Sequence, residues 1–241
     1  MRIKLYPNFN EVFIDDTLKG IFYPLCSVVL DQYPENVFHF VSSNGLWINE
    51  GFETEYNTFH YTQFNLIENK YKFKGSKELY KGAEQAQNIF DRLEKDFEHN
   101  GKHYLKTKTS TDDYIENQKR NLNLKADDEF DADYYLQTFY EFSINKLNFE
   151  LTNEFGAFKN VIEGWIKNDQ LSSIVYDISS NNSSFTDIEL NAVYLFPESI
   201  NISDNEKIGQ VIGCEFFTDG NDSNLLYNKN DGTILNINSY S

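Results

Sequence analysis

The stretch SKELYKGAEQAQNIFDRLEKDFEHNG, residues 76–101, decides the fold class. Its apolar residues recur at alternating intervals of four and three positions: Leu79, Ala83, Ala86, Phe90, Leu93 and Phe97. This spacing places them in one stripe along an α-helix, which is typical of a face buried in a core. Ser76 is a suitable N-cap, Glu78 suits the positive end of the helix dipole, and Asn100-Gly101 is a suitable stop. The sequence therefore predicts a helix over Ser76–His99.

Strand-like patterns lie on both sides of this helix. Val37–Val41 and Leu46–Ile48 flank the dipeptide Asn44-Gly45, which is typical of hairpin turns, so we expect these two runs to pair. Alternating apolar residues over 52–73 indicate further antiparallel strands with one solvated face. After residue 171 strand-like runs return, with an Asp231-Gly232 turn before the last of them: Ser173–Tyr176, Ile188–Phe196, Ile208–Phe217, Leu225–Tyr227 and Thr233–Ile237.

The middle of the chain holds the remaining helical patterns. A short strand is predicted at His103–Leu105, and the polar residues 106–125 are weakly helical at best. Asp131 precedes a second helix, and Phe158–Ile166 indicates a third. The order of strands, about three helices and strands predicts an α+β fold. We expect mainly antiparallel strands at both ends of the chain, with the helices packed on the sheet.

The length of 241 residues suits a single domain over residues 1–241. A subdivision is the alternative, with a β-rich part (1–75), a helical part (76–168) and an acidic β-rich part (169–241).

The sequence indicates neither a membrane span nor a secretory route. Apolar runs such as Ser27–Leu30 are far shorter than the roughly 20 residues that cross a bilayer. The N-terminal segment reaches Pro7 and Asn8 before the apolar core of a signal peptide could form. We therefore expect a soluble, cytoplasmic protein. Cys26 and Cys214 form no C-x-x-C pair, and we expect both to be buried thiols.

The net charge of −17 is the most informative feature of the composition. AT-rich codons, which the abundance of Asn, Phe and Tyr suggests for a bacterial source, also favour Lys. Acidic residues nevertheless outnumber basic ones by 38 to 21. The charge opposes binding to nucleic acids and to anionic membranes, since both need Lys and Arg to neutralise phosphates. It permits a basic protein partner, although solubility through self-repulsion explains the charge equally well.

The four histidines give no metal-site pattern that the predicted elements support. His99 and His103 have the i,i+4 spacing of two ligands on one helix face, but Asn100-Gly101 is expected to end the helix between them. His39 and His60 fall in predicted strands, where they could meet across a sheet, but no Cys or carboxylate cluster completes a site. We expect both of these to be structural.

Common catalytic and cofactor motifs do not occur in the sequence. The glycines form no G-x-G-x-x-G or Walker pattern, and there is no G-x-S-x-G nucleophile elbow. The acidic cluster Asp127–Asp133 fails the calcium-loop pattern because Ala132 and Thr138 stand where Gly and Glu are needed. We interpret the cluster as the acidic first turn of the helix that follows it. No cofactor or metal ion is expected.

One segment near the end of the chain resembles a known family. Ile208–Gly220, followed by Leu225–Tyr227 and the Asn230-Asp231-Gly232 turn, is similar to the terminal hairpins of bacterial SUKH-type immunity proteins. The similarity covers about 30 residues, and the first 200 residues suggest no family. It implies a protein that neutralises a toxin by binding it.

These observations favour a non-enzymatic, acidic binding protein of a bacterium, of the immunity type, that blocks a cationic toxin by covering its positive site. Residues 169–241 hold 11 acidic and only 2 basic side chains, so we expect the hairpin ends there to form the contact. The predicted partner-binding residues are Glu215, Asp219, Asp222 and Asp231. Two alternatives stay open: a housekeeping scaffold domain, and a carbohydrate-active enzyme whose paired carboxylates come from distant strands.

Overall fold

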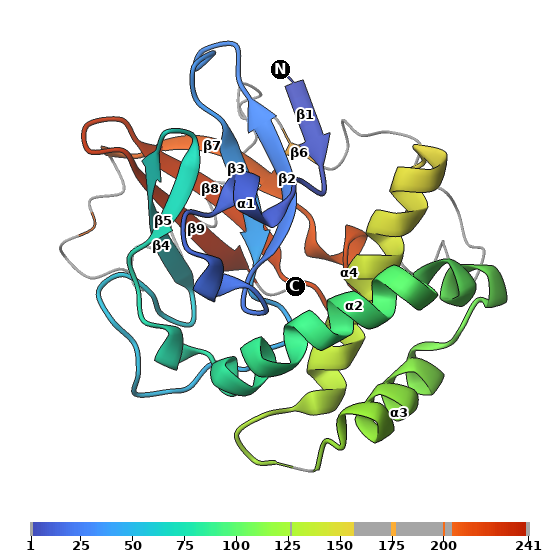
Figure 1. The fold of residues 1–241 in the computed structure, drawn as a ribbon. Coiled ribbons are helices and arrows are strands. Elements are labelled where there is room, and N and C mark those ends of the chain that lie inside the picture. Colours follow the sequence, from blue (N-terminus) through green and yellow to red (C-terminus); the bar gives the residue numbers. More distant parts are fainter. Residues whose placement is uncertain (1, 126, 157–174, 177–199, 201–203, 240–241) are drawn as a thin grey trace.

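A computed structural model describes residues 2–125, 127–156, 175–176, 200 and 204–239 (Figure 1). Two antiparallel sheets are built from the two ends of the chain, and three helices lie between them in sequence. The predicted α+β fold is therefore confirmed. Among the helices of the described residues, none is long and apolar enough to cross a membrane.

The first sheet has three strands in the order β1-β2-β3: β1 (Arg2–Leu5), β2 (Tyr23–Val29) and β3 (Phe38–Ser42). The second has six in the order β5-β4-β9-β8-β7-β6: β4 (Tyr61–Ile67), β5 (Lys70–Phe73), β6 (Val175–Tyr176), β7 (Glu206–Val211), β8 (Asp222–Asn228) and β9 (Thr233–Ser239). The second sheet thus joins strands from both ends of the chain. The two sheets face one another, and the rings of Phe38 and Tyr227 meet between them at 5.1 Å.

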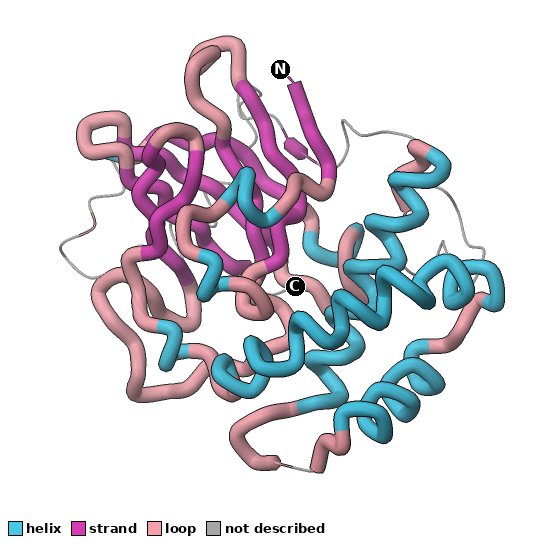
Figure 2. Tube along the Cα trace, viewed as in Figure 1, coloured by secondary structure: helices cyan, strands magenta, loops and turns pink. Residues whose placement is uncertain are grey.

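Three long helices gather on one side of the sheets, as Figure 2 shows, and a short one packs against β2 and β5. They are the short α1 (Phe9–Val12) and the longer α2 (Ala83–Thr107), α3 (Thr111–Leu122) and α4 (Ala132–Thr152). The stripe predicted on α2 does enter the core, where Ala86 and Leu93 are fully buried. Phe90 and Phe97 pack edge-on against Phe139 of α4, with ring centroids 5.7 and 6.3 Å away.

The predicted ends of the first helix are wrong. Ser76 caps a 3-10 helix, Lys77–Leu79, and α2 begins only at Ala83. At the other end α2 runs through Gly101 to Thr107, because this glycine serves side-chain packing: a Cβ atom there would lie 2.7 Å from the ring of Phe97. The strand predicted at His103–Leu105 is consequently the last part of α2.

The predicted hairpin around Asn44-Gly45 does not form. β3 pairs with β2, and Ile48 bridges to Tyr80 instead. The Asn44 side chain is buried, where its amide donates to Thr138 Oγ1 at 3.1 Å and its oxygen accepts from the Tyr134 hydroxyl at 2.8 Å. These bonds turn the chain toward α4 and away from β3.

The segment 106–125, expected to be weakly helical at best, contains the well-defined α3. Two side chains of this polar segment make buried contacts with other helices. The ring of Tyr114 stacks on that of Tyr140 of α4 at 4.2 Å, and the buried Gln118 donates to Asp96 of α2 at 2.8 Å. Tertiary packing therefore supplies what the helical pattern of the segment lacks.

The strands predicted after residue 171 agree with β6 to β9 where the structure describes them, and Gly232 has the positive φ of +75° expected in the turn. One prediction was too long: the Ile208–Phe217 strand ends at Val211, and a 3-10 helix, Gly213–Glu215, follows. The helix predicted at Phe158–Ile166 and the strand at Ile188–Phe196 lie outside the described residues. The single domain stays a prediction.

Candidate binding surface

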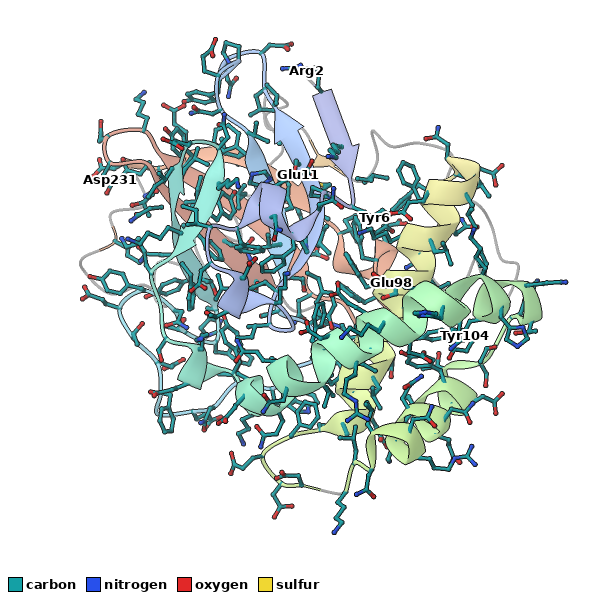
Figure 3. All side chains as sticks on the ribbon, viewed as in Figure 1. Arg2, Tyr6, Glu11, Glu98, Tyr104 and Asp231 are labelled. Atoms are coloured by element: carbon teal, nitrogen blue, oxygen red, sulfur yellow. The ribbon has the colours of Figure 1, made fainter. Side chains whose placement is uncertain are left out.

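The four predicted partner-binding residues do not lie together. Asp222 begins β8, whereas Asp231 lies in the turn between β8 and β9, at the opposite end of that strand. Seven residues of strand separate the two ends by about 20 Å. Figure 3 shows Asp231 at the outer tip of the β8–β9 turn. Glu215 and Asp219 lie with Asp222, in the loop that joins β7 to β8.

Asp222 stabilises this loop. Its two carboxylate oxygens accept from the Gly213 backbone N–H and from Gln210 Nε2, both at 2.9 Å. The loop closes so tightly that a Cβ atom on Gly213 would lie 2.2 Å from the Asn221 carbonyl oxygen. Asp231 has a similar local role, since it accepts from the Thr233 backbone N–H at 2.9 Å. A partner-binding role for either residue stays a prediction.

Glu141 fastens the same loop to α4. Its buried carboxylate accepts from the Thr218 backbone N–H at 2.6 Å and from Gln137 Nε2 at 3.0 Å. Burial raises the pKa of this carboxyl group, and the nearby Asp219 adds to the rise, while the hydrogen bonds from Thr218 and Gln137 oppose it. The exposed Asp219 is thereby held beside α4.

A tryptophan packs against the start of α4. Trp47 is 55% exposed, its ring lies 4.9 Å from that of Tyr134, and its indole N–H donates to Asp131 Oδ2 at 3.0 Å. Burial raises the pKa of the Tyr134 hydroxyl, and the carboxylates of Asp219, Glu141 and Asp131 raise it further. Of these three carboxylates, Asp131 contacts the aromatic pair directly, through the Trp47 indole.

Two residues of the cluster Asp127–Asp133 lie at the start of α4 as predicted, Asp131 and Asp133, whereas Asp127, Asp128 and Glu129 precede the helix. Asp131 is the N-cap, and its side chain accepts from the Tyr134 backbone N–H at 3.1 Å. Asp133 pairs with Lys119 of α3 at 2.6 Å. The same Asp131 also holds Trp47 through its second oxygen, so capping and the aromatic pair share one carboxylate.

Trp47 begins an acidic–aromatic loop, which we define as residues 47–56. Phe52 is 47% exposed, and Glu50, Glu53 and Glu55 are all exposed. No Lys or Arg occurs in the sequence between Lys19 and Lys70. In the structure, cations from later segments lie beside the loop: Lys74 is over the Tyr56 ring at 4.7 Å, and Lys81, Lys119 and Lys125 line a hollow with Trp47. Large apolar side chains exposed beside one another on a surface mark an interaction site more strongly than scattered ones do.

Hydrogen bonds hold the acidic–aromatic loop in place. The Lys81 backbone N–H donates to the Trp47 carbonyl at 2.8 Å, and the Asn49 backbone N–H donates to the Leu79 carbonyl at 2.6 Å. After the loop, the buried Asn57 side chain accepts from the Ser76 N–H at 3.0 Å and donates to the Ser76 carbonyl at 2.8 Å. The loop therefore needs little ordering on binding.

The sequence contains a signal for this loop, although the charge of residues 169–241 drew the predicted surface to another part of the chain. Trp47, Phe52 and Tyr56 alternate with three glutamates inside a stretch without cations. The sequence could not show that Asp131 and Asp219 act on the Trp47–Tyr134 pair, because both are distant from Trp47 along the chain.

Of the two histidines expected to be structural, His39 has such a role. His99 and His103 do lie on one continuous helix, α2, so the reason given for excluding a metal pair was wrong. Within the described residues, however, no group of three or more potential ligands occurs. His39 is buried beside Ser27, while His60 lies in the bend before β4.

The hydrogen bonds of His39 define its protonation. Nε2 lies 2.8 Å from the Asn69 carbonyl, which can only accept, so Nε2 carries the proton. Nδ1 then accepts from the Ser27 hydroxyl at 2.7 Å. Burial lowers the pKa of His39 to about 4, partly opposed by the bond to Asn69. The imidazole is a neutral link between β2, β3 and the β4–β5 turn.

The two cysteines differ in exposure. Cys26 is buried in β2 as predicted, and burial raises its pKa. Cys214 is exposed, which contradicts the prediction, because it lies in the short 3-10 helix after β7 and not in a strand. Both are free thiols.

Comparisons with known protein families, with curated proteins and with solved structures find no match to this chain. They identify no family, so the similarity to SUKH-type immunity proteins stays an expectation from the sequence. The binding surface is accordingly interpreted from its own chemistry.

Proposed function

We propose that the chain is a non-enzymatic acidic binding protein that takes a basic protein partner through the acidic–aromatic loop. The partner we propose is a cationic toxin, which this chain would neutralise as a bacterial immunity protein does. The observation that carries the proposal is Trp47, more than half exposed although it is fixed by Tyr134 and Asp131.

Fixed aromatic side chains are the residues that contribute most to protein interfaces. Trp and Tyr bury a large area at little cost in conformational entropy, and they are enriched among interface hot spots. A Lys or Arg of the partner can lie against the Trp47 ring as a cation–π contact while Glu50 and Glu53 approach its charge. Such a partner matches both the shape and the sign of this surface.

The more distant carboxylates support the same proposal in a different way. Glu215, Asp219, Asp222 and Asp231 add to the negative field, which speeds the encounter with a cationic surface. Asp222 is bonded locally, whereas Asp231 lines the same hollow as Glu55 and Tyr56 at the end of the loop. Among these four we therefore assign direct contact to Asp231, and to Asp219, whose charge acts on Tyr134.

The test uses a defined probe, a 12-residue peptide of alternating Arg and Tyr, with a Glu-for-Arg peptide as its counterpart. Isothermal titration calorimetry measures the affinity of each for the protein. We expect Trp47→Ala to weaken binding of the Arg peptide by at least tenfold, in the range of an interface hot spot. We expect the triple change Glu50→Gln, Glu53→Gln, Glu55→Gln to weaken it comparably.

A matched triple change separates a specific surface from net charge. Glu84→Gln, Asp91→Asn and Glu116→Gln remove the same charge from exposed positions on α2 and α3. These changes should reduce the association rate modestly and leave the dissociation rate unchanged. Equal loss of affinity for both triples, or an unchanged affinity in Trp47→Ala, contradicts the proposal.

A further inference from the structure

A separate cavity of about 410 Å³ opens between α2, α4 and the segment 7–24. Its floor is aromatic: Phe22, Tyr23, Phe139 and Phe142 are buried and line it. Figure 3 shows Glu98, which lines its mouth, where α2 passes across α4. The volume lies within the range of small-molecule sites, roughly 300–1,000 Å³.

Charges of both signs surround the mouth of this cavity. Glu94 of α2 lies there, and no hydrogen bond or ion pair joins its side chain to another described residue. Lys19 and Lys146 also line the mouth, with their nearest carboxylate oxygens 3.9 and 4.0 Å away on Asp16 and Glu150. Ion pairs this long and exposed are weak, so both ammonium groups can turn to a ligand.

Glu94, Lys19 and Lys146 line the same cavity. Desolvation raises the pKa of Glu94, although its side chain is exposed to solvent. The charges of Lys19 and Lys146 lower this pKa, and those of Asp91 and Glu98 raise it. The cavity is therefore lined by charges of both signs in equal number, the acids Glu94, Glu98 and Glu150 and the bases Lys19, Lys102 and Lys146. Among the described residues, Glu94 makes no ion pair within 4.0 Å, and Lys146 and Glu150 lie 4.0 Å apart.

A buried polar group lies below. The hydroxyl of Tyr23 has no hydrogen-bond partner within 3.5 Å among the described residues, although Tyr23 is only 2% exposed. Burial raises the pKa of this hydroxyl, the neighbouring Tyr135 hydroxyl opposes the rise, and the charge of Glu94 adds to it. A polar ligand atom or a water molecule in the cavity can hydrogen-bond to the Tyr23 hydroxyl.

We propose that this cavity binds an α-amino acid with a large apolar side chain. The ammonium group of the ligand lies on Glu94, its carboxylate on Lys19 or Lys146, and its side chain on the rings of Phe139 and Phe142. A zwitterion matches the mouth, because a ligand with one charge can use only the acids or only the bases that line it. The apolar side chain matches the floor. This site is independent of the acidic–aromatic loop and of the function proposed for it.

The experiment compares four ligands that share one ring: L-phenylalanine, its methyl ester, phenethylamine and 3-phenylpropionate. Binding to the full chain is measured by isothermal titration calorimetry and by ligand-observed NMR. We expect L-phenylalanine to bind, and each ligand lacking one charge to bind about tenfold more weakly, because a charge-assisted hydrogen bond is lost. Equal binding of all four ligands, or binding of none, overturns the proposal.

Variants locate the site. Glu94→Gln should weaken the binding of L-phenylalanine about tenfold and that of phenethylamine similarly, but leave the binding of 3-phenylpropionate unchanged. Lys146→Gln should weaken the binding of L-phenylalanine and 3-phenylpropionate and leave that of phenethylamine unchanged. Glu84→Gln and Lys106→Gln, exposed on the same helix but outside the cavity, are the matched controls. If the controls and the cavity variants behave alike, the proposal fails. Because all four side chains lie at the surface, circular dichroism should show the fold intact in every case.

Discussion

His39 shows how one residue couples stability to pH. Its pKa of about 4 in the folded protein lies below the value near 6.5 of an unfolded histidine. The unfolded chain therefore binds more protons between these values, so stability is complete above pH 6.5 and falls as the pH drops toward 4. The total loss from this group is roughly 3 kcal/mol, since each pKa unit corresponds to about 1.4 kcal/mol.

The measurement is the free energy of unfolding in urea at pH 7 and at pH 4.5, for the wild type and for His39→Gln. The wild type should lose more stability than the variant over this interval. Glu94 and Glu141, whose pKa values are raised, act in the opposite direction but are common to both proteins, so the difference isolates His39. An identical loss in the two proteins would show that His39 does not titrate as we describe.

At the scale of an element, α2 combines a core contact with the wall of a cavity, and the two uses differ energetically. Leu93 is fully buried, whereas Phe90 is partly exposed and lines the cavity. Leu93→Ala should therefore cost about 2–5 kcal/mol, because a void opens in a dense core. Phe90→Ala should cost less than the 3–5 kcal/mol typical of a buried Phe, since the cavity already exposes part of its ring.

Urea denaturation of the two variants checks this order. A larger loss for Phe90→Ala than for Leu93→Ala would mean that the cavity is closed in solution. A closed cavity would also leave no space for the amino acid that we propose as its ligand.

The elements also show what the sequence could and could not predict. The stripe of α2 was predictable because the 3.6-residue period records a buried face directly. The C-terminal end of α2 was not predictable, because Gly101 has the sequence pattern of a helix stop. Only the position of the Phe97 ring shows that this glycine serves side-chain packing. α3 was missed because its stabilising contacts, Tyr114 on Tyr140 and Gln118 on Asp96, come from other helices.

The candidate surface follows the same division. Exposed Trp47 and the glutamates after it are contiguous in sequence, so their pattern could be recognised there. Glu215, Asp219, Asp222 and Asp231 were grouped by charge alone, and charge carries no information about which end of a strand a residue occupies. Strand register decides that, and register separates Asp231 from the others.

For the whole molecule, the net charge of −17 predicts a dependence on salt. Self-repulsion disfavours the compact state, and raising NaCl from 10 to 150 mM shortens the screening length from about 30 to about 8 Å. The urea midpoint at pH 7 should therefore rise with salt. Exposed ion pairs such as Lys119–Asp133 weaken at the same time, but such pairs contribute little.

The control is the same titration at pH 4.6, the isoelectric point of the sequence, where the rise should disappear. A midpoint that falls with salt at pH 7 would show that attractive pairs outweigh the repulsion. The acidic character would then have to be explained by local networks and not by the field of the whole protein.

The position of β9 has a consequence for synthesis. This strand lies between β4 and β8, and Thr233 pairs with Asn65, 168 positions earlier. Contacts of such high contact order form slowly, because a long chain segment must be closed before they stabilise anything. On the ribosome, β4 must wait with one edge open until residue 239 has left the exit tunnel. During that interval the nascent chain exposes the unpaired edge of β4 together with apolar side chains that are buried in the folded protein. A chaperone that covers strand edges would therefore raise the yield of folded protein.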